Sequence, residues 1–203
     1  MSAAAFLLQY RATGREKGDG YDSSMFADMD PGELSEARSA MLRRALEGDT
    51  IDLAGLALVG NAAAIAALRK AAGTGVLRAP DRDLVLRETL FALTCDPHEL
   101  EPVLAWLDGR DAYARRQAAE LLARLALPPT LAEPIARRLA RWRLGPAGLP
   151  LATAWLSTQG LPTYRIDGFQ AHLPLVRRIL AAWPWRRAGV LTAVAGELRG
   201  TRP

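Results

Sequence analysis

Apolar side chains recur along this chain in the spacing of a repeated helix pair. The clearest copy runs from Ile51 to Ala72, with apolar residues at helical intervals on both sides of a short turn at Asn61. A leucine near the end of its first helix aligns with three later leucines at spacings of 35, 32 and 31 residues. Positions seven and three residues before each leucine fall on the same helical face. The aligned sets are Ile51, Gly55 and Leu58; Leu86, Leu90 and Leu93; Ala118, Leu122 and Leu125; and Leu149, Thr153 and Leu156.

A second helix is predicted after each of these first helices. Its apolar positions lie seven, ten and fourteen residues after the aligned leucine in the first three copies, and ten residues later than that in the fourth. We therefore predict an insertion at residues 160–169, of sequence GLPTYRIDGF, between the helices of the last copy. Insertions in helical repeats form loops on one rim, and such loops often bind. The second-helix sets are Ile65, Leu68 and Ala72; Leu100, Val103 and Leu107; Ala132, Ile135 and Leu139; and Leu173, Val176 and Leu180.

Capping residues indicate where several of these helices begin. Asp30 precedes Pro31, and Glu33 stands at the third helical position, which is the pattern of a capping box. This pattern predicts an N-terminal capping helix over residues 31–48. Asp49 and Asn61 are suited to cap the two helices of the first copy. By the same reasoning, Asp81 caps the first helix of the second copy.

Together these elements predict an all-α fold: a short right-handed α-solenoid of roughly ten helices. Few aromatic residues and many alanines and leucines favour packed helices over sheets. We expect one domain over residues 1–203, with four helix-pair repeats at 49–183 and a C-terminal capping helix and tail at 184–203. Residues 1–30 do not fit the repeat and are predicted to be irregular, apart from FLLQYR, which is suited to a short helix or strand.

Tandem helix pairs of 31 to 35 residues resemble short bacterial HEAT-like repeats, and the resemblance covers about residues 31–198. The segment from Met41 to Ala72 more narrowly resembles HEAT-like immunity proteins that are encoded beside secreted bacterial toxins. That resemblance implies a non-catalytic protein whose partner is a cognate toxin. The chain departs from the pattern in charge, since many such immunity proteins are acidic and this chain is basic.

The charge of the chain is distributed unevenly. The net charge is +4, but residues 1–109 carry 11 basic and 17 acidic side chains, whereas residues 110–203 carry 15 basic and 5 acidic. Arginine supplies 24 of the 26 basic residues. An arginine-rich face can bind nucleic acid or an acidic protein surface, and genome composition explains the same bias equally well.

Cysteine usage and hydropathy bear on the compartment. The one cysteine, Cys95, excludes an internal disulfide and favours a reducing, cytoplasmic location. The longest uncharged run, residues 53–68, has sixteen residues. A membrane span needs about 20, so no membrane is predicted as a partner.

The candidate chemical motifs are incomplete. Cys95 and His98 are spaced for a metal or a nucleophile pair, but a zinc site needs three or four ligands and the only other histidine is His172. The glycine-rich stretch Gly14 to Gly20 lacks the Gly-Lys-Ser/Thr ending of a phosphate loop and does not follow a convincing strand. We therefore expect no enzyme activity, no cofactor and no metal site.

The candidate binding residues are those that the repeat does not explain. In the insertion, tyrosine and arginine are the residue types that carry interface energy. On the helix predicted over residues 130–144, Arg137 and Arg141 point away from the apolar face, and Trp185 lies beside Pro184 without an assigned packing role. We expect a protein partner, with nucleic acid bound by the C-terminal arginines as the alternative. The candidates are Tyr164, Arg165, Asp167, Phe169, Arg137, Arg141, Arg177, Arg178 and Trp185.

Overall fold

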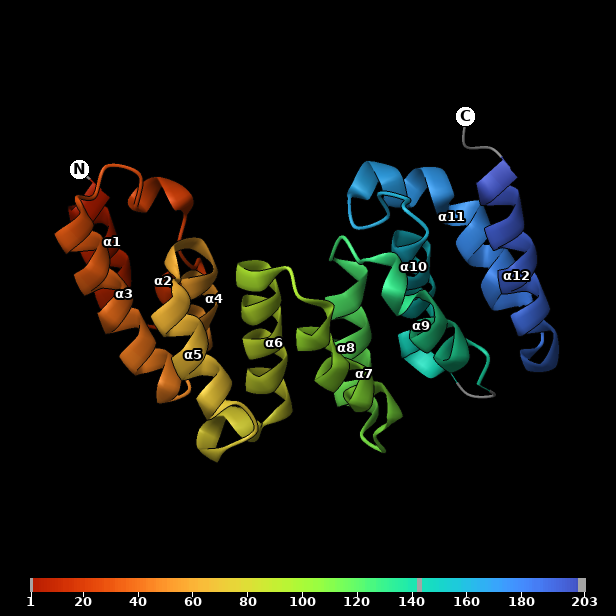
Figure 1. Ribbon diagram of the computed structural model, residues 1–203, viewed down its shortest axis with the longest axis horizontal. Coiled ribbons are helices and arrows are strands. Elements are labelled where there is room, and N and C mark those ends of the chain that lie inside the picture. The colour runs from red at the N-terminus through yellow and green to blue at the C-terminus, as the bar shows by residue number, and fades with distance from the viewer. Residues whose placement is uncertain (1, 142–143, 201–203) are drawn as a thin grey trace. The chain divides into compact units, whose positions relative to one another are not determined.

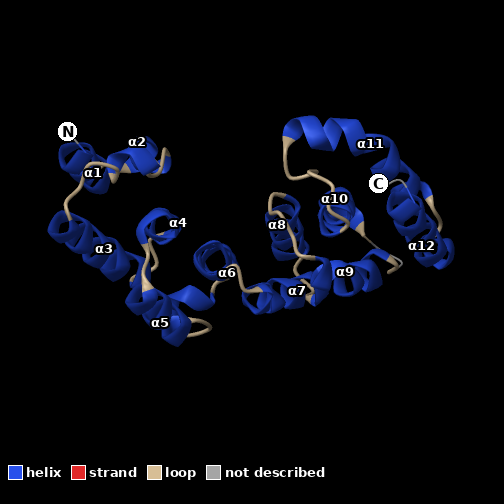
Figure 2. Ribbon diagram, turned by 45° about the horizontal axis from the view of Figure 1, so that its top comes forward, coloured by secondary structure: helices blue, strands red, loops and turns tan. Residues whose placement is uncertain are grey.

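The computed structural model of the protein describes residues 2–141 and 144–200, and within these ranges the chain is all-helical (Figure 1). The predicted all-α class is confirmed. The described residues form twelve α-helices and five short 3-10 helices, where the sequence predicted roughly ten helices. Two of the additional helices lie in the N-terminal segment. Figure 2 shows loops between helices and no strand among the parts that are drawn.

The chain divides into two compact units, residues 1–100 and 101–203, where the sequence predicted one domain. The division falls between a 3-10 helix and the α-helix that follows it, inside the second helix of the second predicted copy. Nothing in the apolar pattern marks this position, because both sides of the division continue the same spacing.

The first unit is built around α3 and α4. Helix α4 packs against α3 on one side and α6 on the other, and α5 packs against both α3 and α6. The buried side chains of α4 include Leu53 and Leu56, neither of which is exposed at all. The helices are α1 (Ser2–Arg11), α2 (Gly14–Gly18), α3 (Pro31–Leu46), α4 (Thr50–Val59), α5 (Ala62–Ala71) and α6 (Pro80–Thr94), with 3-10 turns at Ser23–Met25, Gly75–Arg78 and Pro97–Leu100.

The second unit is built around α10. This helix packs against α8, α9 and α11, while α12 packs against α9 and α11. Nine of its eleven residues are buried, which makes it the central helix of the unit. The helices are α7 (Glu101–Asp108), α8 (Ala112–Ala123), α9 (Ala132–Leu139), α10 (Gly148–Thr158), α11 (Ile166–Ala181) and α12 (Pro184–Gly200), with 3-10 turns at Pro129–Leu131 and Gly145–Ala147.

Two of the six aligned apolar columns are buried in all four copies. The column three residues before the aligned leucine is buried throughout, and the middle column of the second helix is completely inaccessible. The aligned leucines themselves behave differently, because Leu58 is 46% exposed and only Leu156 is buried. The two buried columns are Gly55, Leu90, Leu122 and Thr153, and Leu68, Val103, Ile135 and Val176.

The capping predictions are confirmed for α3, α4 and α5 and are wrong for α6. Asp30 and Glu33 form a complete capping box, and the side chains of Asp49 and Asn61 accept backbone N–H groups. Helix α6 instead begins with Pro80 at its first position, and Asp81 lies inside the first turn. The residue before a proline is pushed to extended backbone, so Ala79 becomes the boundary.

The N-terminal segment contains α1, α2 and a 3-10 turn, so it is not irregular throughout residues 1–30. Phe6 on α1 is 4% exposed and stacks with Tyr10 and Tyr21, with ring centroids 5.6 and 5.8 Å apart. Phe26 packs on the same ring at 5.7 Å. Aromatic rings bury a large area each, and this cluster fixes a segment that the repeat pattern did not include.

The predicted insertion is shorter than ten residues. Helix α11 begins at Ile166, five residues before the predicted start at Ala171, so the last four residues of segment 160–169 are helical. Trp142 and Arg143, which the sequence placed at the end of the helix containing Arg137, lie outside the described residues. Helix α9 ends at Leu139, so Arg141 lies beyond the helix.

Candidate functional site

The segment between α10 and α11 is a tight turn whose backbone is held by hydrogen bonds. Gly160 adopts a φ of +81°, which a glycine tolerates without strain. Thr163 is 3% exposed, and its hydroxyl donates to the carbonyl oxygen of Thr153 at 2.9 Å. The backbone N–H of Arg165 then donates to the carbonyl oxygen of Pro162 at 3.0 Å. The turn is therefore tied both to α10 and to itself.

A glycine on α11 closes the other side of this turn. A Cβ atom on Gly168 would lie 2.1 Å from the carbonyl oxygen of Pro162, which is closer than Cβ atoms come to other heavy atoms in proteins. Only glycine lets the first turn of α11 approach the preceding backbone so closely. The turn thus has little freedom to leave this conformation.

The side chains that this fixed turn carries point to solvent. Tyr164 is 42% exposed and Ile166 is 79% exposed. Arg165 and Asp167 flank them and form an ion pair at 3.4 Å. Phe169 is half-buried. We call Tyr164, Arg165, Ile166 and Asp167 the exposed turn.

Sequence reasoning missed Ile166, the most exposed large apolar residue in this segment. Ile166 was missed because it falls in a segment predicted to be a loop, where only aromatic and charged residues were expected to bind a partner. An isoleucine between arginine and aspartate, with no apolar residue at helical spacing before it, is the signal that could have identified it.

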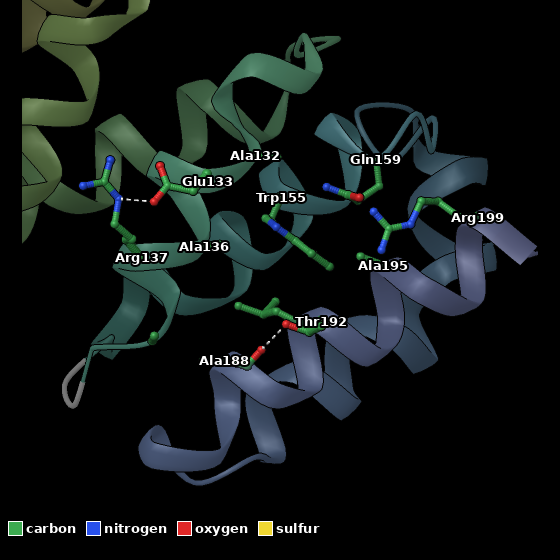
Figure 3. A pocket seen from close by; sticks show the side chains of 12 residues that line it. Ala132, Glu133, Ala136, Arg137, Trp155, Gln159, Ala188, Thr192, Ala195 and Arg199 are labelled. Carbon is green, nitrogen blue, oxygen red and sulfur yellow. Dashed lines mark hydrogen bonds and ion pairs between the residues drawn. The ribbon is translucent and has the colours of Figure 1, made fainter.

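An apolar trough lies between α9 and α12, with α10 as its floor (Figure 3). Its volume is about 470 Å³, and Trp155 of α10, which is 3% exposed, forms its base. The walls carry small side chains from α9 and α12. At one edge Arg137 pairs with Glu133 at 2.9 Å, and at the other lie Gln159 and Arg199. We call this feature the α9–α12 trough; its small wall residues are Ala132, Ala136, Ala140, Ala188, Thr192 and Ala195.

Carboxylates within the second unit neutralise several of the candidate arginines. Arg141 and Arg138 both bind Asp108, at 2.5 and 2.6 Å. Arg178 binds Glu197 through both terminal nitrogens, at 2.8 and 2.9 Å. Pairing holds the pKa of Glu197 below its ordinary value, chiefly through the hydrogen bond from Arg178. The arginines of the second unit that the structure describes therefore do not form one continuous unpaired stripe.

The remaining candidates lie on α11 and α12. Arg177 is exposed on α11, three helical turns beyond the exposed turn. Trp185 is 64% exposed and stacks on Trp183, which is 62% exposed, with ring centroids 5.1 Å apart. The structure therefore distributes the nine candidate residues over several places and brings together only those of segment 164–169.

Arg187 is not among the residues that the sequence singles out, yet it is 6% exposed. It donates to the carbonyl oxygens of Leu139 at 2.7 Å, Arg141 at 3.0 Å and Ala182 at 3.2 Å. Burial lowers the pKa of its guanidinium. Nothing in the sequence separates it from its exposed neighbour Arg186.

A buried polar cluster in the first unit joins the N-terminal segment to α4. Asp52 is completely buried, and Lys17 donates to it at 2.7 Å while the hydroxyl of Tyr21 donates to its other oxygen. Lys17 also pairs with Asp49 at 3.3 Å. Burial, and then the hydrogen bond and charge of Asp52, raise the pKa of Tyr21 well above its ordinary value of 10.0. The cluster ties the N-terminal segment to α4, and Lys17 and Asp49 at its edge also line a pocket.

The residues considered for metal or nucleophilic chemistry are placed as follows. Cys95 is exposed in the left-handed conformation that ends α6, with φ of 53°, and His98 is exposed in the next turn. Over residues 2–141 and 144–200, no three histidine, cysteine or acidic side chains gather as metal ligands would. In the same ranges, no helix is both long enough and apolar enough to cross a bilayer.

Comparison with known proteins adds no assignment. No family model matches the chain, and neither the curated proteins nor the solved structures give a significant match. The functional assignment therefore rests on the geometry of the exposed turn and of the α9–α12 trough.

Proposed function

We propose that this protein is a non-catalytic protein-binding module whose exposed turn contacts the partner. The single observation that carries the proposal is the contrast within that turn. Its backbone is held by Thr163 and Gly168, while Tyr164 and Ile166 extend into solvent.

A fixed backbone with exposed apolar side chains favours association. Binding loses less conformational entropy when the loop is already ordered. Tyrosine is among the residues that most often carry interface energy, and a neighbouring apolar residue extends the area that it can bury. Arg165 and Asp167 beside them supply polar groups for the edge of such an interface.

The most specific version of this proposal is an immunity protein that neutralises a secreted bacterial toxin. Its support is the resemblance of the Met41 to Ala72 segment together with the all-helical fold. In this version the protein works in the cytoplasm and blocks the toxin by occupying its surface.

The test is affinity capture from the native organism with wild type, the double variant Tyr164→Ala/Ile166→Asp, and a control. Tyr113→Ala is a suitable control, since Tyr113 is 66% exposed on α8 and lies outside the turn. We expect a specific protein with wild type and the control, and at least tenfold weaker binding with the double variant. Circular dichroism should show the same helix content in all three. Equal capture by the double variant would exclude the turn as the binding surface.

Identification of the captured protein tests the immunity version separately. If it is a secreted toxin, co-expression of wild type should restore growth and the double variant should not. Capture of a partner that is not a toxin would leave the binding role intact and remove the immunity assignment.

Nucleic-acid binding by the C-terminal arginines is the alternative. It is favoured by the charge of the second unit, which carries 15 basic and 7 acidic residues, a net of +8. It is weakened by the ion pairs of Arg138, Arg141 and Arg178. Binding of this kind falls steeply with salt, which separates it from an apolar protein interface.

A further inference from the structure

The α9–α12 trough is formed by small side chains on two facing helices. Along α9 and its C-cap the wall positions recur every four residues, at Ala132, Ala136 and Ala140, and on α12 the facing positions are Ala188, Thr192 and Ala195. Eight residues of helix span about 12 Å, so the trough is as long as roughly two helical turns. Small side chains form most of both walls, and the buried Trp155 and Leu191 lie beneath them at the bottom.

The trough remains open along one side. Arg137 keeps 68% of its side chain exposed, and Thr192 and Arg199 are exposed on the opposite border. A small apolar ligand is normally enclosed over most of its surface. An occupant of this trough would instead have one face against the small side chains of the two walls and the other in water, which is the requirement met by an amphipathic helix.

The charges around the trough favour an occupant helix that carries a negative net charge. Arg137 has Glu133 as its partner, but Arg199 has no ion-pair partner within the described residues. The unit that contains the trough carries a net charge of +8. Acidic side chains on the flanks of an occupant would therefore be attracted to this border.

We propose that the α9–α12 trough binds an acidic amphipathic helix of a partner protein. The proposal takes the protein-binding role above as its premise and adds the chemistry of the partner. The trough begins at Gln159, which is followed directly by the turn at Gly160, so a partner seated on the exposed turn lies next to its entrance.

The probe is a synthetic amphipathic peptide of roughly five helical turns, with leucines three and four residues apart and glutamates elsewhere. A second peptide replaces every glutamate with lysine. Fluorescence anisotropy of the labelled peptides measures affinity for the full chain, and the indole resonance of Trp155 in NMR spectra reports on occupancy.

Three variants locate the binding, and a fourth tests the role of charge. Ala136→Trp and Ala195→Trp each fill the trough from one wall, and Ala193→Trp is the matched control because Ala193 is exposed on α12 outside the lining. We expect the acidic peptide to bind wild type and the control equally, and each filling variant at least tenfold more weakly. The resonance of Trp155 should shift in wild type, and Arg199→Gln should weaken binding about threefold.

The outcomes are decisive in either direction. Equal binding of the lysine peptide would overturn the charge assignment, and full affinity in both filling variants would overturn the trough as the site. Binding of anilinonaphthalene sulfonate at the trough without peptide binding would assign a small-molecule site instead. The turn variant Tyr164→Ala/Ile166→Asp should still bind the peptide, so failure of the proposed function and failure of this inference are distinguishable.

Discussion

Arg187, near the start of α12, donates from Nη1 to the carbonyl oxygen of Leu139, the last residue of α9, at 2.7 Å across 48 residues of sequence. The last carbonyl groups of a helix have no partner within the helix. The guanidinium supplies partners to this end and to Ala182, and in doing so it fixes α12 against α9. The α9–α12 trough depends on that placement.

Replacing Arg187 should destabilise the protein markedly. Arg187→Met keeps much of the apolar stem but leaves buried carbonyl oxygens without donors, which costs on the order of 3 kcal/mol of unfolding free energy. Arg186→Met is the control, because Arg186 is exposed, and it should change the free energy by less than about 0.5 kcal/mol. Urea unfolding followed by circular dichroism measures both; similar values for the two variants would contradict the structural role of Arg187.

The hydroxyl of Tyr21 should make stability depend on alkaline pH. The folded protein keeps the Tyr21 proton above the ordinary pKa of 10.0, while the unfolded chain releases it. The folded state therefore binds more protons, and the free energy of unfolding falls as pH rises through 10, by up to about 1.4 kcal/mol per pH unit.

Tyr21→Phe removes this dependence. We expect a shallower decline above pH 10 and, at neutral pH, a loss of about 2 kcal/mol from the missing hydrogen bond to the Asp52 carboxylate. Tyr113→Phe should follow wild type, since that ring is exposed. Unfolding titrations between pH 8 and pH 11 make the comparison; parallel curves for wild type and Tyr21→Phe would show that the proton is not retained.

Replacing glycine with alanine should have opposite effects on stability at Gly168 and at Gly196. Gly168→Ala places a methyl group against the carbonyl oxygen of Pro162 and should cost about 2 kcal/mol or displace the turn. Gly196→Ala meets no atom within 4 Å on α12 and should stabilise by about 0.5 to 1 kcal/mol. Thermal unfolding distinguishes the two; destabilisation by Gly196→Ala would mean that this face of α12 is occupied.

Nucleic-acid binding by the C-terminal arginines can be tested with a variant of Asp108. Asp108→Asn releases Arg138 and Arg141 from their shared carboxylate. If these arginines contact phosphates, the variant should bind DNA more tightly than wild type and with a steeper salt dependence. We expect no binding by either protein at 0.15 M salt in a mobility-shift titration, with Arg178→Gln as a further comparison. Salt-sensitive retardation that increases in Asp108→Asn would favour the alternative.

The sequence was most informative where a local pattern determines structure. The capping box of Asp30 and Glu33 places the start of α3, and the column Leu68, Val103, Ile135 and Val176 is inaccessible because helical spacing keeps these positions on one face. Leu58, the residue on which the four copies were aligned, is 46% exposed and not part of the core. Helix α4 buries positions 52, 53 and 56, and residue type alone does not reveal which of several apolar stripes turns inward.

Contacts between distant segments could not be predicted. The partner of Asp52 is Lys17, 35 residues away in a glycine-rich stretch with no helical pattern. The exposed turn was recognised as a departure from the repeat, but its rigidity depends on Thr153 and Gly168, whose roles arise only when α10 and α11 pack. The α9–α12 trough is likewise a property of facing helices and not of either one.

The ties between the N-terminal segment and α4 limit how the protein can be shortened. A fragment starting at the capping box of Asp30 keeps every predicted repeat intact. It would nevertheless uncover the apolar face that Phe6 and Phe26 cover, and it would remove Lys17 and Tyr21, the two donors of Asp52. Such a fragment should aggregate, so the start point that looks most natural from the repeat pattern is the least suitable for producing a shortened form.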